Sequence, residues 1–526
     1  MKRLPVLLLI FGGMLLAAAF AAPAVGEAKT CAESAYFCAE AAESVGYAGE
    51  YTGHDEPSLL FYSNKRGPGN SNVYKFVLPR DPVQQPTQDG LGATWNFQLR
   101  PAFWFGMDMC DTQSSPEFQH DTCKADSDSN IFDNPDPNAP DYIGHHPGGA
   151  FMEMQFYPPG WTPWEAGVSC SATQWCGALT IDSLSVSQVD NTTQNQQCLN
   201  LAGVEPVSFA FITKSGVPQA SPDPTTDFQP PFAASTVDPS KDLFMNPGDT
   251  IVLDMHDTAA GFQVVIHDLT TGESGSMTAS VANGFRQVLY EPHSTCHTAP
   301  YAYHPMYATS NEHTRLTWTA HGYNVAYSDE IGHFEYCNTV VSGKCKSGGA
   351  TDPTADSDDV VCFDASESLL VLVSGCIGTD TDFDGPVYQP TSWPGTNSTR
   401  PVSAPVVFTS PLFNGRSNYD RVAFEADLPR IEAADFGGSC NRTTGAGCVN
   451  PPPGANFYPI FSTGTLAGQC VWQEGGAAIP GTTNTFGGNS TAEFGPLFQL
   501  FYPIPGGVRY RYNDFRNTLS TNPCPA

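Results

Sequence analysis

The stretch PGDTIVLDMHDTAAGFQVVIHDLTTGE, residues 247–273, predicts a β-hairpin and decides the fold class. Apolar residues recur at every second position on both sides of 258–261, which is typical of strands that bury one face. A turn at these positions pairs Asp257 with Phe262 and His256 with Gln263. The side expected to face the core is continuously apolar and carries Ile251, Leu253, Met255, Phe262, Val264 and Ile266.

The opposite face of this hairpin is a candidate binding surface. It carries Asp254, His256, Gln263 and His267, interspersed with Val252 and Val265. Two histidines beside an acid and an amide can donate, accept and titrate within one small area. A solvated polar surface without a ligand is the alternative interpretation.

The rest of the chain is also rich in strand and turn signals. Its 526 residues include 49 glycines and 45 prolines, and apolar residues recur with period two far more often than with the helical period. We expect an all-β protein whose main domain is an antiparallel jelly roll or β-sandwich. Residues 31–45 are the exception, because Cys31, Ala35, Cys38 and Ala42 have the spacing of one helix face.

Two changes in composition indicate the domain organisation. Residues 216–241 are rich in proline and small polar residues, which predicts a long excursion or linker. Residues 342–359 form a second polar stretch, and we place the main boundary there because the strand patterns on both sides of the first stretch look alike. The expected order is a signal peptide at 1–22, a main β domain at 23–345, a linker at 346–359 and a smaller β-rich domain at 360–526.

The N-terminus has the layout of a secretory signal peptide. Lys2 and Arg3 precede an apolar run, residues 4–20, and small residues at 19–22 offer a cleavage site. All 16 cysteines follow this leader, so we expect an exported protein with up to eight disulfides. Local bridges are easiest for Cys170 with Cys176 and for Cys440 with Cys448. No later apolar run reaches the length of about 20 residues that spans a bilayer, so we expect no membrane anchor.

The charge balance narrows the range of partners. The chain has 54 acidic and 23 basic residues, a formal net charge of −31. Such a surface repels nucleic-acid phosphates and anionic lipid headgroups, which disfavours both as ligands. Neutral sugars and cations remain suitable partners.

Two further strands carry acids. In AFMEMQF, residues 150–156, Glu153 and Gln155 face away from three apolar side chains. A carboxylate in such a strand either faces a groove or is buried and paired. In IGHFEYC, residues 331–337, His333 and Glu335 share a face. Glu153 and Glu335 are therefore the candidate carboxylate pair.

The surroundings of Glu153 suggest a family. Glu153, Gln155, Trp161 and Trp164 resemble the concave face of concanavalin-like jelly-roll glycosidases, whose catalytic strand commonly reads E-x-D-x-E or E-x-x-x-E. The chain departs from that pattern, since Gln155 and Tyr157 stand where acids are expected. The resemblance implies that one glutamate acts as general acid and the other as nucleophile or base. The stretches HPGGAFMEMQFYPPGW and SDEIGHFEYC also resemble uncharacterised secreted bacterial proteins, which implies export.

Metal ions are a further alternative. His256, His267 and His333 with Glu153 are suitable ligand types for Zn, Cu or non-haem Fe, although no H-x-H or H-E-x-x-H spacing supports a transition-metal site. TDTDFDG places Asp380, Asp382 and Asp384 at alternate positions before a glycine, as in calcium-binding loops. The twelfth position is a threonine, so the usual glutamate ligand is missing. A structural calcium site and an acidic solvated turn are the two interpretations.

The sequence favours a protein that binds or hydrolyses extracellular polysaccharide through a polar groove on a β-sandwich. A non-catalytic envelope or extracellular structural protein and a histidine-based metalloenzyme are the alternatives. Signatures of other enzyme classes are absent from the sequence, including G-x-S-x-G, the Walker loop and the Rossmann fingerprint. Hydrolysis requires Glu153 and Glu335 to converge in an open cleft, whereas a structural protein can bury or scatter them.

Overall fold

A computed structural model gives the structure of the chain. It describes residues 38–41, 58–62, 69–80, 103–113, 148–157, 159, 170–183, 193, 195–203, 206–289, 291, 295–305, 322–327, 337–341, 344–348, 406–413, 417–419, 421–425, 461–474, 497–504, 507–513, 515–519 and 521–525. The statements below concern these residues.

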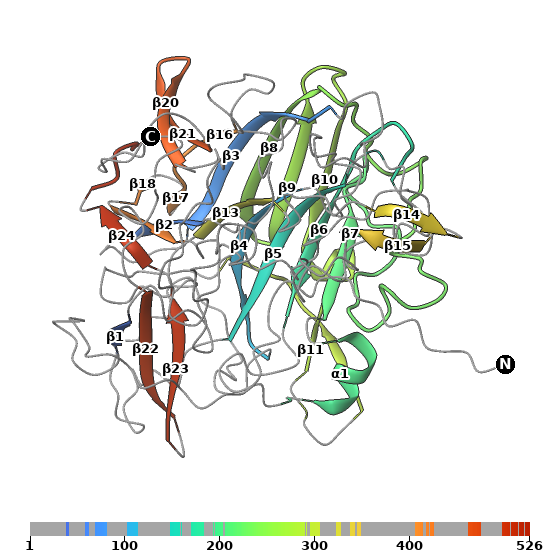
Figure 1. Cartoon of the computed structure of the whole chain (residues 1–526), viewed down its shortest axis with the longest axis horizontal. Helices are drawn as coiled ribbons and strands as arrows, with labels where there is room; N and C mark the ends of the chain where they lie inside the picture. Colours follow the sequence, from blue (N-terminus) through green and yellow to red (C-terminus); the bar gives the residue numbers. More distant parts are fainter. Residues whose placement is uncertain are drawn as a thin grey trace.

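Two antiparallel sheets form the main body of the protein (Figure 1). The eight-stranded sheet has, in spatial order, β24 (Phe515–Leu519), β19 (Arg421–Glu425), β2 (Ser58–Tyr62), β13 (Gly322–Tyr327), β4 (Phe103–Asp111), β5 (Gly148–Tyr157), β6 (Cys176–Asp182) and β7 (Val207–Phe211). The nine-stranded sheet runs in the order β10 (Ser274–Thr278), β9 (Gly261–Asp268), β8 (Thr250–Thr258), β3 (Gly69–Val77), β16 (Val407–Phe408), β21 (Gln469–Glu474) and β20 (Phe461–Leu466). In addition, β17 (Leu412–Phe413) pairs with β3, and β18 (Ser417–Asn418) pairs with β17. All pairings within both sheets are antiparallel, which confirms the expected all-β class.

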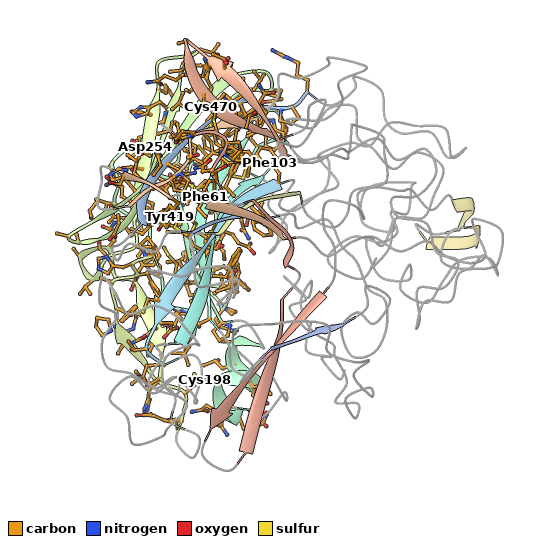
Figure 2. All side chains as sticks on the ribbon, turned by 90° about the vertical axis from the view of Figure 1, so that its left-hand side faces the viewer. Phe61, Phe103, Cys198, Asp254, Tyr419 and Cys470 are labelled. Carbon is orange, nitrogen blue, oxygen red and sulfur yellow. A yellow bond between two sulfur atoms is a disulfide. The ribbon has the colours of Figure 1, made fainter. Side chains whose placement is uncertain are left out.

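The two sheets share one hydrophobic core. Phe76 of β3 contacts the rings of Phe105 on β4 and Phe156 on β5, with centroids 5.2 and 5.3 Å apart. Phe61 and Phe103, labelled in Figure 2, belong to the same core. Because burial of apolar surface is the main favourable contribution to folding, this shared layer holds the sheets face to face as a sandwich.

The hairpin predicted at 247–273 is β8–β9, and its predicted register is confirmed. Asp257 pairs with Phe262 and His256 with Gln263, around a turn at Thr258–Gly261. The predicted core side is fully buried at all six positions: Ile251, Leu253, Met255, Phe262, Val264 and Ile266. Alternation with period two therefore determined which face enters the core.

Strands from the C-terminal part of the chain join both sheets. β16 lies between β3 and β21, and β19 lies between β2 and β24. Trp472 of β21 and Phe61 of β2 contact each other in the shared core, with ring centroids 6.1 Å apart. The expected linker, apart from its first residues, lies outside the described ranges. The described strands that follow it nevertheless share sheets and a core with strands that precede it.

Smaller elements lie around the sandwich. They are β1 (Cys38–Ala41) with β22 (Leu497–Ile504) and β23 (Gly507–Asn513), β11 (Arg286–Val288) with β12 (Thr298–Pro300), β14 (Cys337–Val341) with β15 (Lys344–Gly348), the helix α1 (Gln196–Ala202), and the 3-10 turn η7 (Val281–Asn283). The helix expected at 31–45 is wrong where the chain is described, because Cys38–Ala41 is a strand that pairs with Leu497–Leu500. Pairing with a distant strand overrides the local helical spacing there.

Three disulfides lie in the described part of the chain. Cys170–Cys176 is the predicted local bridge, whereas Cys198–Cys296 and Cys470–Cys524 join distant segments. Cys198–Cys296 joins α1 to the segment just before β12. The proposed Cys440–Cys448 bridge lies outside the described residues.

The excursion expected at 216–241 is part of a long, ordered connection. We call residues 213–249, which join β7 to β8, the strap. Its side chains Phe228, Val237 and Phe244 pack on a second hydrophobic cluster over β6 and β7. Members of that cluster on the two strands include Ala178, Val207, Phe209 and Phe211. The strap therefore covers the outer side of the eight-stranded sheet at this edge.

Candidate functional site

The outer face of the nine-stranded sheet is accessible to solvent along β3, β8, β9 and β10. We call it the open face. Cross-strand pairing aligns its side chains in three rows. The rows are Thr278–Gln263–His256–Ser71, Ser276–Val265–Asp254–Val73 and Ser274–His267–Val252–Lys75. None of these twelve residues is buried, and Asp254, labelled in Figure 2, lies on this outer side.

Hydrogen bonds connect side chains from three neighbouring strands of the open face. Nδ1 of His256 lies 3.1 Å from Oδ1 of Asp254, two residues earlier on β8. Nε2 of Gln263 donates to Oγ1 of Thr278 over 2.9 Å, which joins β9 to β10. Asp254, His256, Gln263 and Thr278 thus form a polar group, which we call the polar row.

The surroundings of His256 raise its pKa. The hydrogen bond with Asp254 is the largest influence and raises the pKa of His256; partial burial opposes it, and the charge of Asp254 and a hydrogen bond with Gln263 add to it. The side chains of His256 and Asp254 are 29% and 39% exposed, so a ligand can reach both. The polar row therefore presents an imidazole, a carboxyl group, an amide and a hydroxyl on an accessible sheet surface.

His267 does not join the polar row. It lies on the open face four residues along β9 from Gln263, about 13 Å at the usual rise per residue. Its row neighbours are Val252 and Ser274. The structure brings three of the four predicted polar residues of the hairpin together and leaves His267 exposed at a distance.

The second predicted site lies on β5, on the face turned away from the shared core. Nε2 of Gln155 donates to Oε2 of Glu153 over 2.5 Å, and the hydroxyl of Tyr157 donates to Oε1 of Gln155. Glu153 is half-buried, whereas Gln155 is fully buried and Tyr157 nearly so. Gln155 therefore acts as a bridge that fixes the Glu153 carboxylate.

An aromatic pair lies beside Glu153. The rings of Trp104 and Phe151 meet edge to face, with centroids 5.5 Å apart. Both lie over Gly106, the residue that faces Glu153 on β4. A Cβ at Gly106 would lie 2.5 Å from the Phe151 ring, so only glycine fits without rearrangement. The sheet thus places a carboxylate next to a small apolar wall.

The other predicted site residues lie outside the described residues. They are Trp161, Trp164, His333, Glu335, Asp380, Asp382 and Asp384. The convergence of Glu153 with Glu335 and the calcium loop therefore stay predictions. Within the described ranges, no three histidine, cysteine or acidic side chains are grouped so as to hold a metal ion.

Sequence reasoning missed several residues at both sites. Tyr157 shares the period-two face of Glu153 and Gln155, so its place was readable from the strand. Thr278 is placed beside Gln263, and Gly106 beside Glu153, only by the pairing of different strands. Nothing in the local sequence of either residue indicates this placement.

Comparisons with known proteins add no relative: no family model, no curated protein and no solved structure matches the chain. Within the described residues, no helix has the length and apolar character needed to cross a bilayer.

Proposed function

We propose that this is a secreted protein that binds neutral extracellular polysaccharide on its open face. The observation that carries the proposal is the polar row on an accessible sheet surface. His256 is hydrogen-bonded to Asp254 on β8, Gln263 of β9 donates to Thr278 of β10, and His256 and Gln263 are cross-strand neighbours. Sugar hydroxyls both donate and accept, and the row offers both kinds of partner. Side chains fixed in advance also lose less entropy when a ligand binds.

The apolar residues of the open face support the same ligand class. Val73 and Val265 flank Asp254 in the middle row, and Val252 lies in the next row. They would contact the C–H surfaces of sugar rings while the polar row binds the hydroxyls.

Electrostatics favour a neutral ligand. The formal net charge of −31 repels polyanions. Within the row, the one acidic side chain, Asp254, is paired with His256. The 16 cysteines and the leader-like N-terminus support the extracellular part of the proposal.

Binding to a panel of neutral and acidic polysaccharides tests the proposal. Affinity electrophoresis or calorimetry is run on the wild type, on the double variant His256→Ala/Gln263→Ala, and on His267→Ala as a control on the same face. We expect the double variant to lose roughly tenfold or more in affinity, since two hydrogen bonds of about 1 kcal/mol each are removed. The control keeps the wild-type affinity.

Equal affinity of all three proteins, or no binding to any neutral polysaccharide by the folded wild type, contradicts the proposal. Circular dichroism of each variant checks that the fold is intact.

Hydrolysis is a second candidate, favoured by the half-buried Glu153 beside the Trp104–Phe151 pair. In this reading Gln155 orients the carboxylate through its hydrogen bond. Turnover of a bound polysaccharide that disappears in Glu153→Gln and in Glu335→Gln would favour it. Binding without turnover leaves the polar row as the functional site.

A further inference from the structure

A histidine with a side-chain partner on each ring nitrogen lies beside the short hairpin β11–β12. Nε2 of His297 lies 2.6 Å from Oγ1 of Thr295, and Nδ1 of the same ring lies 2.8 Å from Oε2 of Glu291. The three side chains thus form a chain of hydroxyl, imidazole and carboxylate, which we call the hydroxyl triad. None of the three belongs to the polar row or to the site on β5.

Backbone contacts hold both ends of the hydroxyl triad. The N–H of Leu289 donates to the carbonyl of His297 over 2.9 Å, which continues the β11–β12 ladder as far as the histidine. Asn195, the N-cap residue of α1, donates from its side chain to the carbonyl of Glu291 over 2.6 Å. The ladder therefore holds the imidazole end, and the helix cap holds the carboxylate end.

The disulfide Cys198–Cys296 adds a covalent restraint between the hydroxyl and the imidazole. Cys296 is the residue between Thr295 and His297, and its partner Cys198 is a fully buried residue of α1. Figure 1 shows α1 beside β11, and Cys198 is labelled in Figure 2. The segment that carries the triad is therefore attached to α1 at two points, and such support keeps reacting groups in one geometry.

The carboxylate determines which nitrogen of His297 carries the proton. An ionised carboxylate only accepts hydrogen bonds, so Glu291 places the proton of the neutral ring on Nδ1. Nε2 then has a lone pair with which it accepts from the Thr295 hydroxyl. In this order of groups, a histidine acts as general base toward a hydroxyl nucleophile while the acid orients the ring.

The hydroxyl triad is open to solvent. The side chains of His297 and Glu291 are 54% and 40% exposed, and Thr295 is exposed as well. A substrate can therefore reach Oγ1 without any opening of the fold, and water can hydrogen-bond an oxyanion that forms there. The methyl group of a threonine lies on the same carbon as its hydroxyl, so small acyl groups meet less crowding than bulky ones.

We propose that the hydroxyl triad hydrolyses accessible esters of small acyl groups such as acetyl. Oγ1 of Thr295 attacks the acyl carbon while its proton passes to Nε2 of His297. The bond from the acyl carbon to the alcohol oxygen breaks, and the alcohol leaves with that proton. Water, deprotonated by the same nitrogen, then hydrolyses the acyl-threonine and restores the hydroxyl. The net reaction converts an ester and water into an acid and an alcohol, and it does not depend on ligand binding by the open face.

Hydrolysis of 4-nitrophenyl acetate by the full chain tests the proposal. We expect kcat/KM to fall about 100-fold or more in Thr295→Val and in His297→Ala, since a positioned general base contributes about 10²–10⁴-fold. Thr295→Val keeps the imidazole and so measures attack by His297 alone. Thr295→Ser keeps the hydroxyl and should retain the activity. Thr173→Val, at an exposed threonine within the loop closed by Cys170–Cys176, is the matched control and keeps the wild-type rate.

Glu291 is a positioning residue in this mechanism, because it orients the ring and does not contact the substrate. We expect Glu291→Gln to lower kcat roughly tenfold or more and to leave KM unchanged. A variant that merely unfolded the loop would not separate kcat from KM in this way. Equal kcat values in the wild type and Glu291→Gln overturn the role of Glu291.

Labelling with a fluorophosphonate gives a readout that does not depend on turnover. The Thr295 oxygen displaces fluoride from phosphorus while its proton passes to His297, and peptide mass spectrometry locates the phosphonyl group. We expect a label on Thr295 in the wild type and labelling at least about tenfold slower in His297→Ala. Wild-type hydrolysis by Thr295→Val overturns the proposal, as does equal labelling of Thr295 in the wild type and His297→Ala. A folded wild type with neither hydrolysis nor label also overturns it.

Discussion

The open face and the face under the strap are both outer faces of antiparallel sheets, but their outward side chains differ in burial. On the open face, polar and aliphatic side chains alternate, and none of its twelve residues is buried. Under the strap, the outward positions of β6 and β7 include Ala178, Thr180, Phe209 and Phe211, which are buried. The outer side of a sandwich sheet is therefore not defined by strand alternation alone. It also depends on whether a connection returns to cover it.

Polar groups on the open face and polar groups in the strap differ in their access to solvent. On the open face, His256 and Asp254 pair with each other and remain accessible to solvent. Within the strap, Asp227 and Asp242 are buried and accept hydrogen bonds from backbone N–H groups. This contrast is why we assign ligand binding to the open face and not to the covered one.

The largest expected effect comes from the covered face. Phe209→Ala removes a buried ring that contacts Phe211 and Phe228, with centroids 5.0 and 5.4 Å away. We expect the free energy of unfolding to fall by about 3–5 kcal/mol in urea denaturation. The matched change Val265→Ala on the open face should cost less than about 1 kcal/mol. Similar losses for both variants would mean that the two faces do not differ in burial.

Gly106→Ala tests the wall beside Glu153. The added Cβ meets the rings of Phe151 and Trp104 at 2.5 and 2.6 Å, so one of the rings must move. We expect a loss of about 1–3 kcal/mol in the free energy of unfolding, as for other overpacked sites. The double variant Gly106→Ala/Phe151→Ala removes one of the clashing rings and should recover part of the loss. No loss in the single variant would show that the aromatic pair does not lie over the glycine.

Gln155→Leu and Gln263→Leu compare one substitution on the two faces. Gln155 bridges Glu153 and Tyr157 in a fully buried position, so its loss should cost about 1–3 kcal/mol. Gln263 is partly exposed, and water can replace its amide, so the cost should stay below about 1 kcal/mol. Thermal unfolding of both variants ranks the two effects, and the reverse order would contradict the assignment of the faces.

The smallest effect is the pH dependence of the His256–Asp254 pair. The pair raises the pKa of His256, so the stabilisation is present below the usual histidine pKa of about 6.5 and is lost as pH rises through the raised value. Both side chains are substantially exposed, so the difference between wild type and Asp254→Asn should stay below about 1 kcal/mol. Unfolding at pH 5.5 and 8.5 measures it. If wild type and Asp254→Asn differed more in the free energy of unfolding at pH 8.5 than at pH 5.5, the His256–Asp254 pair would not be the cause of the difference.

Local signals predicted some features of this molecule well and others poorly. The β8–β9 hairpin was predictable in face and register because its alternation and turn are local. Cys170–Cys176 was predictable for the same reason. The strand at Cys38–Ala41 was not, because its hydrogen bonds come from residues 497–500. The Asp-Pro pairs of the strap were visible as turn signals, but the burial of Asp227 depends on its contact with Phe209 of β7.

The residues of the candidate sites were likewise predictable where one local segment carries them, and not where distant strands bring them together. Asp254, His256 and Gln263 were predictable as neighbours because one hairpin carries all three. Thr278 joined them only through the pairing of β9 with β10. The pairing of Glu153 with Glu335 stays a prediction, since Glu335 lies outside the described residues.

Protection of His256 by a bound polysaccharide tests the assignment of the open face most directly. Histidines of the wild type are modified with diethyl pyrocarbonate, with and without a saturating neutral polysaccharide, and the products are quantified by mass spectrometry. We predict that the ligand slows modification of His256 and leaves His267 largely unchanged. Saturable binding with both histidines modified at their ligand-free rates would show that the polysaccharide binds elsewhere.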